Sequence, residues 1–107
     1  MEMLVLIPRS HIDILKSSVR GLLSTITSSG LVCTKFCSVT FKDDKLLIDS
    51  IAEYQLKHLQ SYSKVSVMVV DPTNVDSWLS IQGTAINLNV NGSRCSVDIG
   101  NVISFQG

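Results

Sequence analysis

The stretch from Lys64 to Ala85 places the strongest constraint on the fold. It begins with a short apolar run, Val65–Val70, in which four of the six residues are β-branched. Such a run is typical of a β-strand. Side chains alternate along a strand, so the three odd-numbered valines face one side, and Met68 and Val70 face the other. We therefore predict a strand that is covered on both faces, inside a sheet and against something beyond that sheet.

The end of this stretch predicts a turn, a second strand and a bend. Asp71-Pro72 ends the first strand, because proline has no amide hydrogen and restricts the residue before it. Asn74–Ser77 is expected to be a turn or short loop. From Trp78 onward, apolar residues fall at odd positions as far as Gly83 and at even positions from Ile86. One extra residue must therefore be accommodated, and we place a β-bulge or bend at 83–85.

Asn91-Gly92 is the strongest hairpin signal in the chain and predicts a two-residue type I′ turn. In the resulting register the apolar pairs share one face and the polar pairs share the other. The last strand then runs to about Ile99, and residues 101–107 continue the barrel after a bend at Gly100. The predicted pairs are Val90 with Ser93, Asn89 with Arg94, Leu88 with Cys95, Asn87 with Ser96 and Ile86 with Val97.

The residues upstream predict a meander of three antiparallel strands and two short helices. The strands are expected over 21–27, 31–41 and 46–50, with a turn at Ser28-Ser29-Gly30 and a charged turn over 42–45. A helix is expected over 52–60, because Ala52, Leu56 and Leu59 recur at helical spacing. Another helix is expected over 10–17, with Ser10 as its N-cap.

The composition indicates one small domain that associates with a partner. The 107 residues are 45% hydrophobic, which is high for a small monomer. Nine basic residues balance nine acidic ones, so no strong field would attract nucleic acid or a membrane surface. Met1–Pro8 is too short for a signal peptide or a membrane span, and it lacks the basic residues with which a signal peptide begins. We expect an arm or edge strand over residues 1–9 and a single barrel domain over 10–107.

The three cysteines do not indicate a metal site or a disulfide framework. Their number is odd and no Cys-x-x-Cys motif is present. Cys33 and Cys37 would lie about 13 Å apart on one strand. We interpret them and Cys95 as small apolar residues in a reducing cytoplasm; a catalytic thiol would need a His or Asn partner that the sequence does not suggest. No metal-ligand cluster, catalytic triad or nucleotide-binding motif is visible.

The order of these motifs resembles the flavin-binding split-barrel proteins, relatives of pyridoxamine 5′-phosphate oxidase and of the deazaflavin-dependent reductases. The resemblance covers about residues 12–85 and implies a mainly β fold with short helices, a split β-barrel of about six antiparallel strands. It rests on Gly21-Leu22-Leu23-Ser24-Thr25-Ile26, Ser29-Gly30, Val39-Thr40-Phe41, Leu46-Leu47-Ile48-Asp49-Ser50, the Val-Val-Asp-Pro ending at Pro72, and Trp-Leu-x-Ile-x-Gly-Thr-Ala from Trp78.

The resemblance also implies a function: a cytoplasmic homodimer that holds FMN, or a deazaflavin, at the subunit interface and acts as an oxidoreductase on a small substrate. The cofactor phosphate would be met by Ser50, beside Asp49 at the end of the third strand, and by a basic residue of the next helix. Here Gln55 stands where a lysine is common, and Lys57 lies two residues on. Lys57 can equally be an exposed partner of Glu53.

The flavin ring is implied to lie against the backbone of the second strand, and residues of a later strand would reach the partner's cofactor. The proline often found in that second strand is absent. The alternative is a cofactor-free split-barrel dimer that acts as a binding or interaction module, favoured by Gln55 and by the few residues after the last strand. The candidate cofactor residues are Ser38, Val39, Thr40, Asp49, Ser50, Gln55, Lys57, Trp78 and Gln82.

Overall fold

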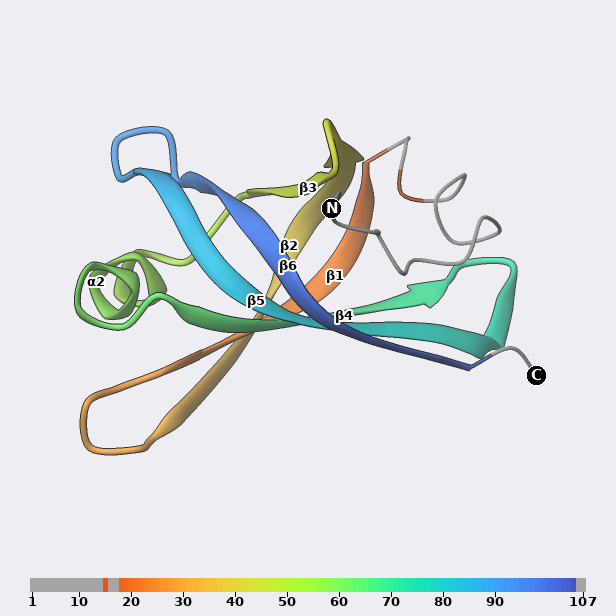
Figure 1. Cartoon of the computed structure of the whole chain (residues 1–107), viewed down its shortest axis with the longest axis horizontal. Coiled ribbons are helices and arrows are strands. Elements are labelled where there is room, and N and C mark those ends of the chain that lie inside the picture. Colours follow the sequence, from red (N-terminus) through yellow and green to blue (C-terminus); the bar gives the residue numbers. More distant parts are fainter. Residues whose placement is uncertain (1–14, 16–17, 106–107) are drawn as a thin grey trace, which may run out of the picture.

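The computed structural model describes residue 15 and residues 18–105, and shows a closed barrel of six antiparallel strands in the order β1-β2-β3-β6-β5-β4 (Figure 1). The mainly β architecture predicted from the sequence is confirmed. The arm over 1–9 and all but Leu15 of the expected first helix and its flanks lie outside the described residues. The strands are β1 (Val19–Ile26), β2 (Val32–Lys42), β3 (Lys45–Asp49), β4 (Lys64–Asp71), β5 (Asn74–Asn89) and β6 (Arg94–Phe105), and the helix α2 (Glu53–Ser61) joins β3 to β4.

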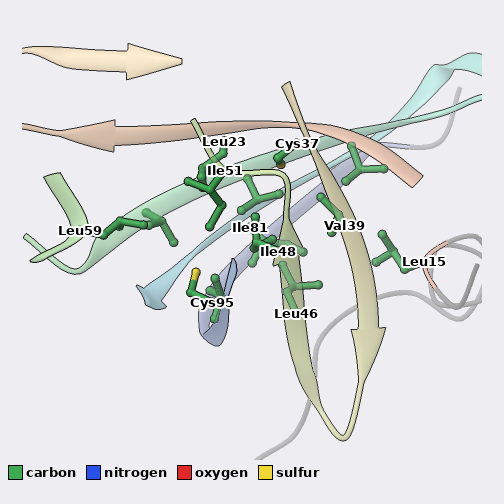
Figure 2. Packing of buried hydrophobic residues seen from close by; sticks show 14 of the residues in the cluster. Leu15, Leu23, Cys37, Val39, Leu46, Ile48, Ile51, Leu59, Ile81 and Cys95 are labelled. Atoms are coloured by element: carbon green, nitrogen blue, oxygen red, sulfur yellow. The ribbon is translucent and has the colours of Figure 1, made fainter. Parts of the chain in front are cut away.

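The interior of the barrel is filled by alternate side chains of every strand (Figure 2). The predicted inward face of β4 is confirmed, because its three odd-numbered valines are at most 5% exposed. Each aliphatic side chain buried in this way contributes about 1.5–3 kcal/mol to folding. Met68 and Val70, on the outer face of β4, remain 40% exposed. Within the described residues, the outer face therefore lacks the cover that the sequence predicted.

The Asn91-Gly92 turn is present, but its predicted type is wrong. The Ser93 amide donates to the Val90 carbonyl (3.2 Å), which closes a β-turn. Neither central residue has a positive φ, whereas Ser93 has a φ of 54°. The turn is therefore not type I′, and the Asn89 side chain stabilises it by accepting the Gly92 amide at 2.9 Å. The type I′ signature of two positive φ angles occurs instead at Asp43 and Asp44, in the charged turn between β2 and β3.

The register predicted for this hairpin holds next to the turn and then fails. Asn89 opposes Arg94 as expected, but Ile86 opposes Ser96 rather than Val97. The cause is Asn87, which has a φ of 52° and adds an extra residue to β5. The bulge that changes the phase of β5 therefore lies at Asn87, four residues beyond Gly83, and not at 83–85.

Two further irregularities shape the ends of β5 and β6. Gly100 is an extra residue on β6, between the pairs Gln82–Asn101 and Gly83–Ile99, so the bend predicted at Gly100 is confirmed. At the other end, β5 begins at Asn74, and the expected loop over 74–77 is part of that strand. The chain reverses at Pro72-Thr73, where the Asp71 carboxylate accepts the Thr73 amide at 2.8 Å.

The bend supplies a matched pair of glycines with different expected tolerance. A Cβ at Gly83 would meet the Asp98 carbonyl oxygen and lie 2.6 Å from Val97 Cγ1. We expect Gly83→Ala to lower the free energy of unfolding by about 1–3 kcal/mol through overpacking. At Gly100 the nearest atom is 3.3 Å away, so Gly100→Ala should cost less than about 1 kcal/mol. Urea unfolding measures both, and equal losses would contradict this account of the bend.

Candidate functional site

The first hollow of interest lies where β1 begins, beside the end of β3. Arg20 of β1 opposes Ser38 of β2, and Ser38 opposes Asp49 of β3. The chain leaves β3 through Ser50, whose φ is 61°. The amide of Ile51 then donates to the Ser93 carbonyl at 3.0 Å and anchors this exit. The hollow has a volume of about 300 Å³ and is lined by Ser18, Val19, Arg20, Phe36, Cys37, Ser38 and Ser50.

The polar groups of this hollow can hold an anion. The Arg20 guanidinium lies 3.8 Å from the centre of the Phe36 ring, a cation–π contact that limits where the side chain points. The hydroxyls of Ser38 and Ser50 line the same hollow, and no carboxylate does. The neighbouring Asp49 carboxylate is paired with Arg94 at 3.3 Å. A guanidinium with two hydroxyls is a suitable donor set for a phosphate or carboxylate.

Asp49 belongs to a second, smaller hollow of about 240 Å³ between β3, β5 and β6. Arg94 lines it too, together with the polar side chains of Asn87 and Asn89. Both members of the Asp49–Arg94 pair are more than 40% exposed, so the pair contributes little to stability. Asp49 is thus adjacent to the Arg20 hollow without being part of it.

Gln55 connects α2 to the first hairpin. Its side chain is fully buried, and its amide nitrogen donates to the carbonyls of Leu23 at 2.8 Å and Cys33 at 3.1 Å. Its Oε1 is buried with no hydrogen-bond partner among the described residues. Lys57 lies on the exposed face of the same helix and lines none of the hollows described above. The two helix candidates therefore lie on opposite faces of α2.

The remaining candidates are spread over the barrel. Val39 is fully buried and lies between Val19 of β1 and Ile48 of β3 in the sheet. Thr40 is half-buried near the end of β2, opposite Leu47. Trp78 is half-buried on β5, opposite Val70. Gln82 is exposed four residues further along β5 and lines a third hollow, on the outer surface of the barrel. Of the nine candidates, the structure brings Ser38 and Ser50 together.

Sequence reasoning missed Arg20, because the first strand was expected to begin at Gly21. The register of the first hairpin could have located Arg20 from the sequence. A turn centred on Ser29 pairs residues whose numbers add to 58, which places Arg20 opposite Ser38. Extending that count by one residue beyond the predicted strand would have found the cation.

The cysteines are placed as expected for structural residues. Cys37 and Cys95 are buried and Cys33 is half-buried, all as free thiols. Burial raises the pKa of Cys37 to about 12, with a smaller contribution from nearby Cys95. Burial likewise raises the pKa of Cys95 to about 11, with a smaller contribution from Asp49. Such thiols stay protonated near neutral pH and are poor nucleophiles. Among the described residues, no group of three or more His, Cys, Asp or Glu side chains could hold a metal ion.

Comparison with solved structures places this barrel among known folds. An F420 reductase aligns with a TM-score of 0.74 and 16% identity, over 91% of this chain and 98% of that one. HupZ from Group A Streptococcus aligns with a TM-score of 0.72 and 11% identity, over 92% and 94%. A candidate pyridoxamine 5′-phosphate oxidase from Lactobacillus delbrueckii aligns with a TM-score of 0.70 and 14% identity, over 94% and 95%.

These alignments define the class of fold. The chain has the split-barrel fold of the F420 reductase and of the oxidase-like protein, as the sequence resemblance predicted. No model of a known protein family matches the chain, and no curated protein matches it in sequence. No helix in the described residues is long and apolar enough to cross a membrane.

The raised pKa values of Cys37 and Cys95 predict a loss of stability at alkaline pH. Above pH 9 the unfolded chain releases both thiol protons, while the folded chain retains them up to about pH 11–12. Stability should therefore fall as pH rises through this window. The double variant Cys37→Ala/Cys95→Ala should be less stable at pH 7, because of the cavities, but should lose less stability between pH 8.5 and 10.5. Thermal melts at several pH values measure this, and parallel curves for both proteins would contradict it.

Proposed function

We propose that this protein is a homodimeric split-barrel oxidoreductase of the cytoplasm that binds the phosphate of FMN, or of a deazaflavin cofactor, in the Arg20 hollow. The observation that carries the proposal is the meeting of Arg20, Ser38 and Ser50 around one open hollow of about 300 Å³. From the sequence resemblance, Ser50 was expected at the phosphate and Ser38 at the flavin ring. The third supplies the cation that the helix position Gln55 lacks.

The donor set of the hollow fits an anionic group. A phosphate needs charge-assisted donors, and Arg20 offers a planar guanidinium whose position is limited by Phe36. The left-handed backbone at Ser50 turns the chain away from β3 and leaves Ser50 exposed at the rim. Ser38 of β2 lines the hollow, and Val39 and Thr40 follow it along the strand. These residues would bind and orient the cofactor, which supplies the hydride chemistry when it is bound.

The outer face of the barrel supports the homodimer. Phe36, Leu22, Met68 and Ile103 belong to one row across the sheet, in which Leu22 opposes Phe36 and Met68, and Ser80 joins Met68 to Ile103. We call this the outer apolar row. Phe36, Met68 and Ile103 are 56%, 40% and 53% exposed. Exposed apolar side chains aligned across neighbouring strands favour a protein partner.

The outer apolar row and the Arg20 hollow are continuous, because Phe36 belongs to both. A second copy seated on the row would lie at the edge of the hollow. Trp78, whose strand neighbour Ser80 lies in the row, would then be near the partner subunit. A cofactor held at the hollow would be shielded from water by this partner, and that shielding strengthens the interaction of Arg20 with a phosphate.

A cofactor-free binding module remains the second candidate function, and one observation favours it. Gln55, which stands where the resemblance places a lysine, is committed to the Leu23 and Cys33 carbonyls. The helix position that would contact the phosphate therefore serves the structure of the hairpin. Under this alternative the outer apolar row would still bind a partner, and the Arg20 hollow would hold no flavin.

The cofactor site is tested by titrating FMN and a deazaflavin cofactor while recording fluorescence and melting temperature. We expect Arg20→Gln and Ser50→Ala each to weaken binding by roughly tenfold, through the loss of donors to the phosphate. Lys42→Gln, which removes an exposed cation at the end of β2 and outside the hollow, is the control and should not change the affinity. Loss of binding in Lys57→Ala but not in Arg20→Gln would move the phosphate to α2. No binding of either cofactor would favour the cofactor-free module.

The homodimer is tested separately by sedimentation. We expect the wild-type chain to sediment as a dimer, and Met68→Glu/Ile103→Glu to sediment as a monomer, because two charges would be buried in the interface. Val90→Glu places the same change on an exposed apolar residue in the β5–β6 turn, and it should leave the dimer intact. A monomeric wild-type protein at micromolar concentration would rule out the proposed interface.

A further inference from the structure

A third hollow, larger than the two described above, lies on the outer surface of the barrel and shares no residue with the Arg20 hollow. Its volume of about 450 Å³ is within the range of small-molecule sites, roughly 300–1,000 Å³. We call it the outer groove. It crosses β1, β4, β5 and β6, and one lip is formed by Val32 at the start of β2.

The centre of the outer groove is a row of polar residues in register. Ser24 of β1 opposes Ser66 of β4, Ser66 opposes Gln82 of β5, and Gln82 opposes Asn101 of β6. Successive strands lie about 4.8 Å apart, so the row is roughly 14 Å long. Ser24 is hydrogen-bonded to Thr34 at 2.9 Å. Within residues 18–105, the side chains of Ser66, Gln82 and Asn101 make no hydrogen bond.

The bend between β5 and β6 leaves this row open. Gly83 and Gly100 both line the groove, and neither has a side chain to fill it. Gly100 is the extra residue of β6, so the two strands separate from regular pairing at this point. The side chains of Ser66, Gln82 and Asn101 therefore surround an open space. This space lies at the one point of the β5–β6 pairing where β6 has an extra residue.

The side chains that line the groove carry a positive charge, which favours an anionic ligand. Lys64 lines it, and its Nζ is 3.5 Å from the Thr84 hydroxyl, a long contact to a neutral group. No carboxylate lines the groove. Asp98, which opposes Thr84 on β6, lies 3.8 Å from the Lys45 ammonium instead. Lys64 thus remains available to a negatively charged ligand.

We propose that the outer groove binds a small anionic molecule that carries several hydroxyl groups, the chemical class of sugar phosphates and sugar acids. Hydroxyls both donate and accept hydrogen bonds, as do the side chains of Ser66, Gln82 and Asn101. The anionic group pairs with Lys64. The aliphatic side chains of Ile26 and Val32 offer a surface for the C–H face of a sugar ring. This binding does not require a flavin.

The groove borders the outer apolar row, because Ser66 and Gln82 are two residues from Met68 and Ser80 on the same strands. A partner chain seated on the row would leave the groove at the boundary of the interface. The ligand would then be bound by the proposed dimer, and the experiment therefore uses the whole 107-residue chain.

The test is a titration of the isotope-labelled protein with glucose 6-phosphate, followed by NMR of the backbone amides. Glucose and inorganic phosphate serve as comparison probes. We expect shifts at residues 64–66, 82–84 and 100–101, with each comparison probe at least about tenfold weaker, because each lacks half of the recognised groups. No shift at these amides up to millimolar concentration would overturn the proposal. Shifts confined to residues 20, 38 and 50 would place the phosphate in the Arg20 hollow and overturn it equally.

Variants separate the groove from the rest of the surface. Lys64→Gln should weaken glucose 6-phosphate binding by roughly tenfold, and Gln82→Ala by a few-fold. Lys42→Gln and Gln60→Ala are matched controls at exposed positions outside the groove and should bind within about twofold of the wild type. Unfolding curves confirm that each variant is folded. Equal effects in the groove variants and their controls would show binding to the surface in general and reject the site.

Discussion

The close approach of β5 and β6 at Gly83 is the constraint on which the barrel depends. The backbone of β6 passes so near to Gly83 that no Cβ fits between this residue and the Asp98 carbonyl. Beyond this point β6 pairs with β3, through residues 95–97 opposite 46–48, and this pairing closes the barrel. On the C-terminal side of this contact, residues 99–105 of β6 pair with β5. One glycine contact therefore divides β6 into a part that closes the barrel and a part that extends one edge of the outer face.

The two hollows that we assign to ligands share one structural cause. Each lies where a strand departs from regular pairing: at Ser50, where β3 ends in a left-handed residue, and at Gly100, where β6 carries one residue more than β5. In a regular ladder the backbone groups are hydrogen-bonded between strands and the side chains are packed. Irregular positions are therefore where a barrel of this size can offer polar groups to a ligand. The core reaches both hollows, because buried Cys37 lines the first and buried Val65 lines the second.

The sequence predicted local features well and long-range geometry poorly. The alternation of Val65, Val67 and Val69 identified the buried face of β4, because one face of a strand must be apolar if the barrel is filled. The hairpin after Asn89 was located, but its register slipped at Asn87, because a polar residue in a left-handed conformation carries no hydrophobic signal. Ser38 and Ser50 were chosen through the resemblance. Arg20 was missed, because its place depends on pairing across the first hairpin. The groove depends on the pairing of β1 with β4, β4 with β5 and β5 with β6, and no local pattern indicates it.

The buried carboxamide of Gln55 has a consequence for the motions of the molecule. Its amide group joins α2 to a carbonyl of β1 and a carbonyl of β2, and His58 Nδ1 adds a contact to Thr25 Oγ1 at 3.2 Å. The hairpin formed by β1 and β2 extends away from the barrel at its turn (Figure 1). Because the same helix residue is bonded to both strands, the tip of the hairpin cannot separate from the barrel without breaking its bonds to the helix. Helix and hairpin tip should therefore open together as one cooperative unit, with a common rate of amide hydrogen exchange that is faster than that of the barrel core.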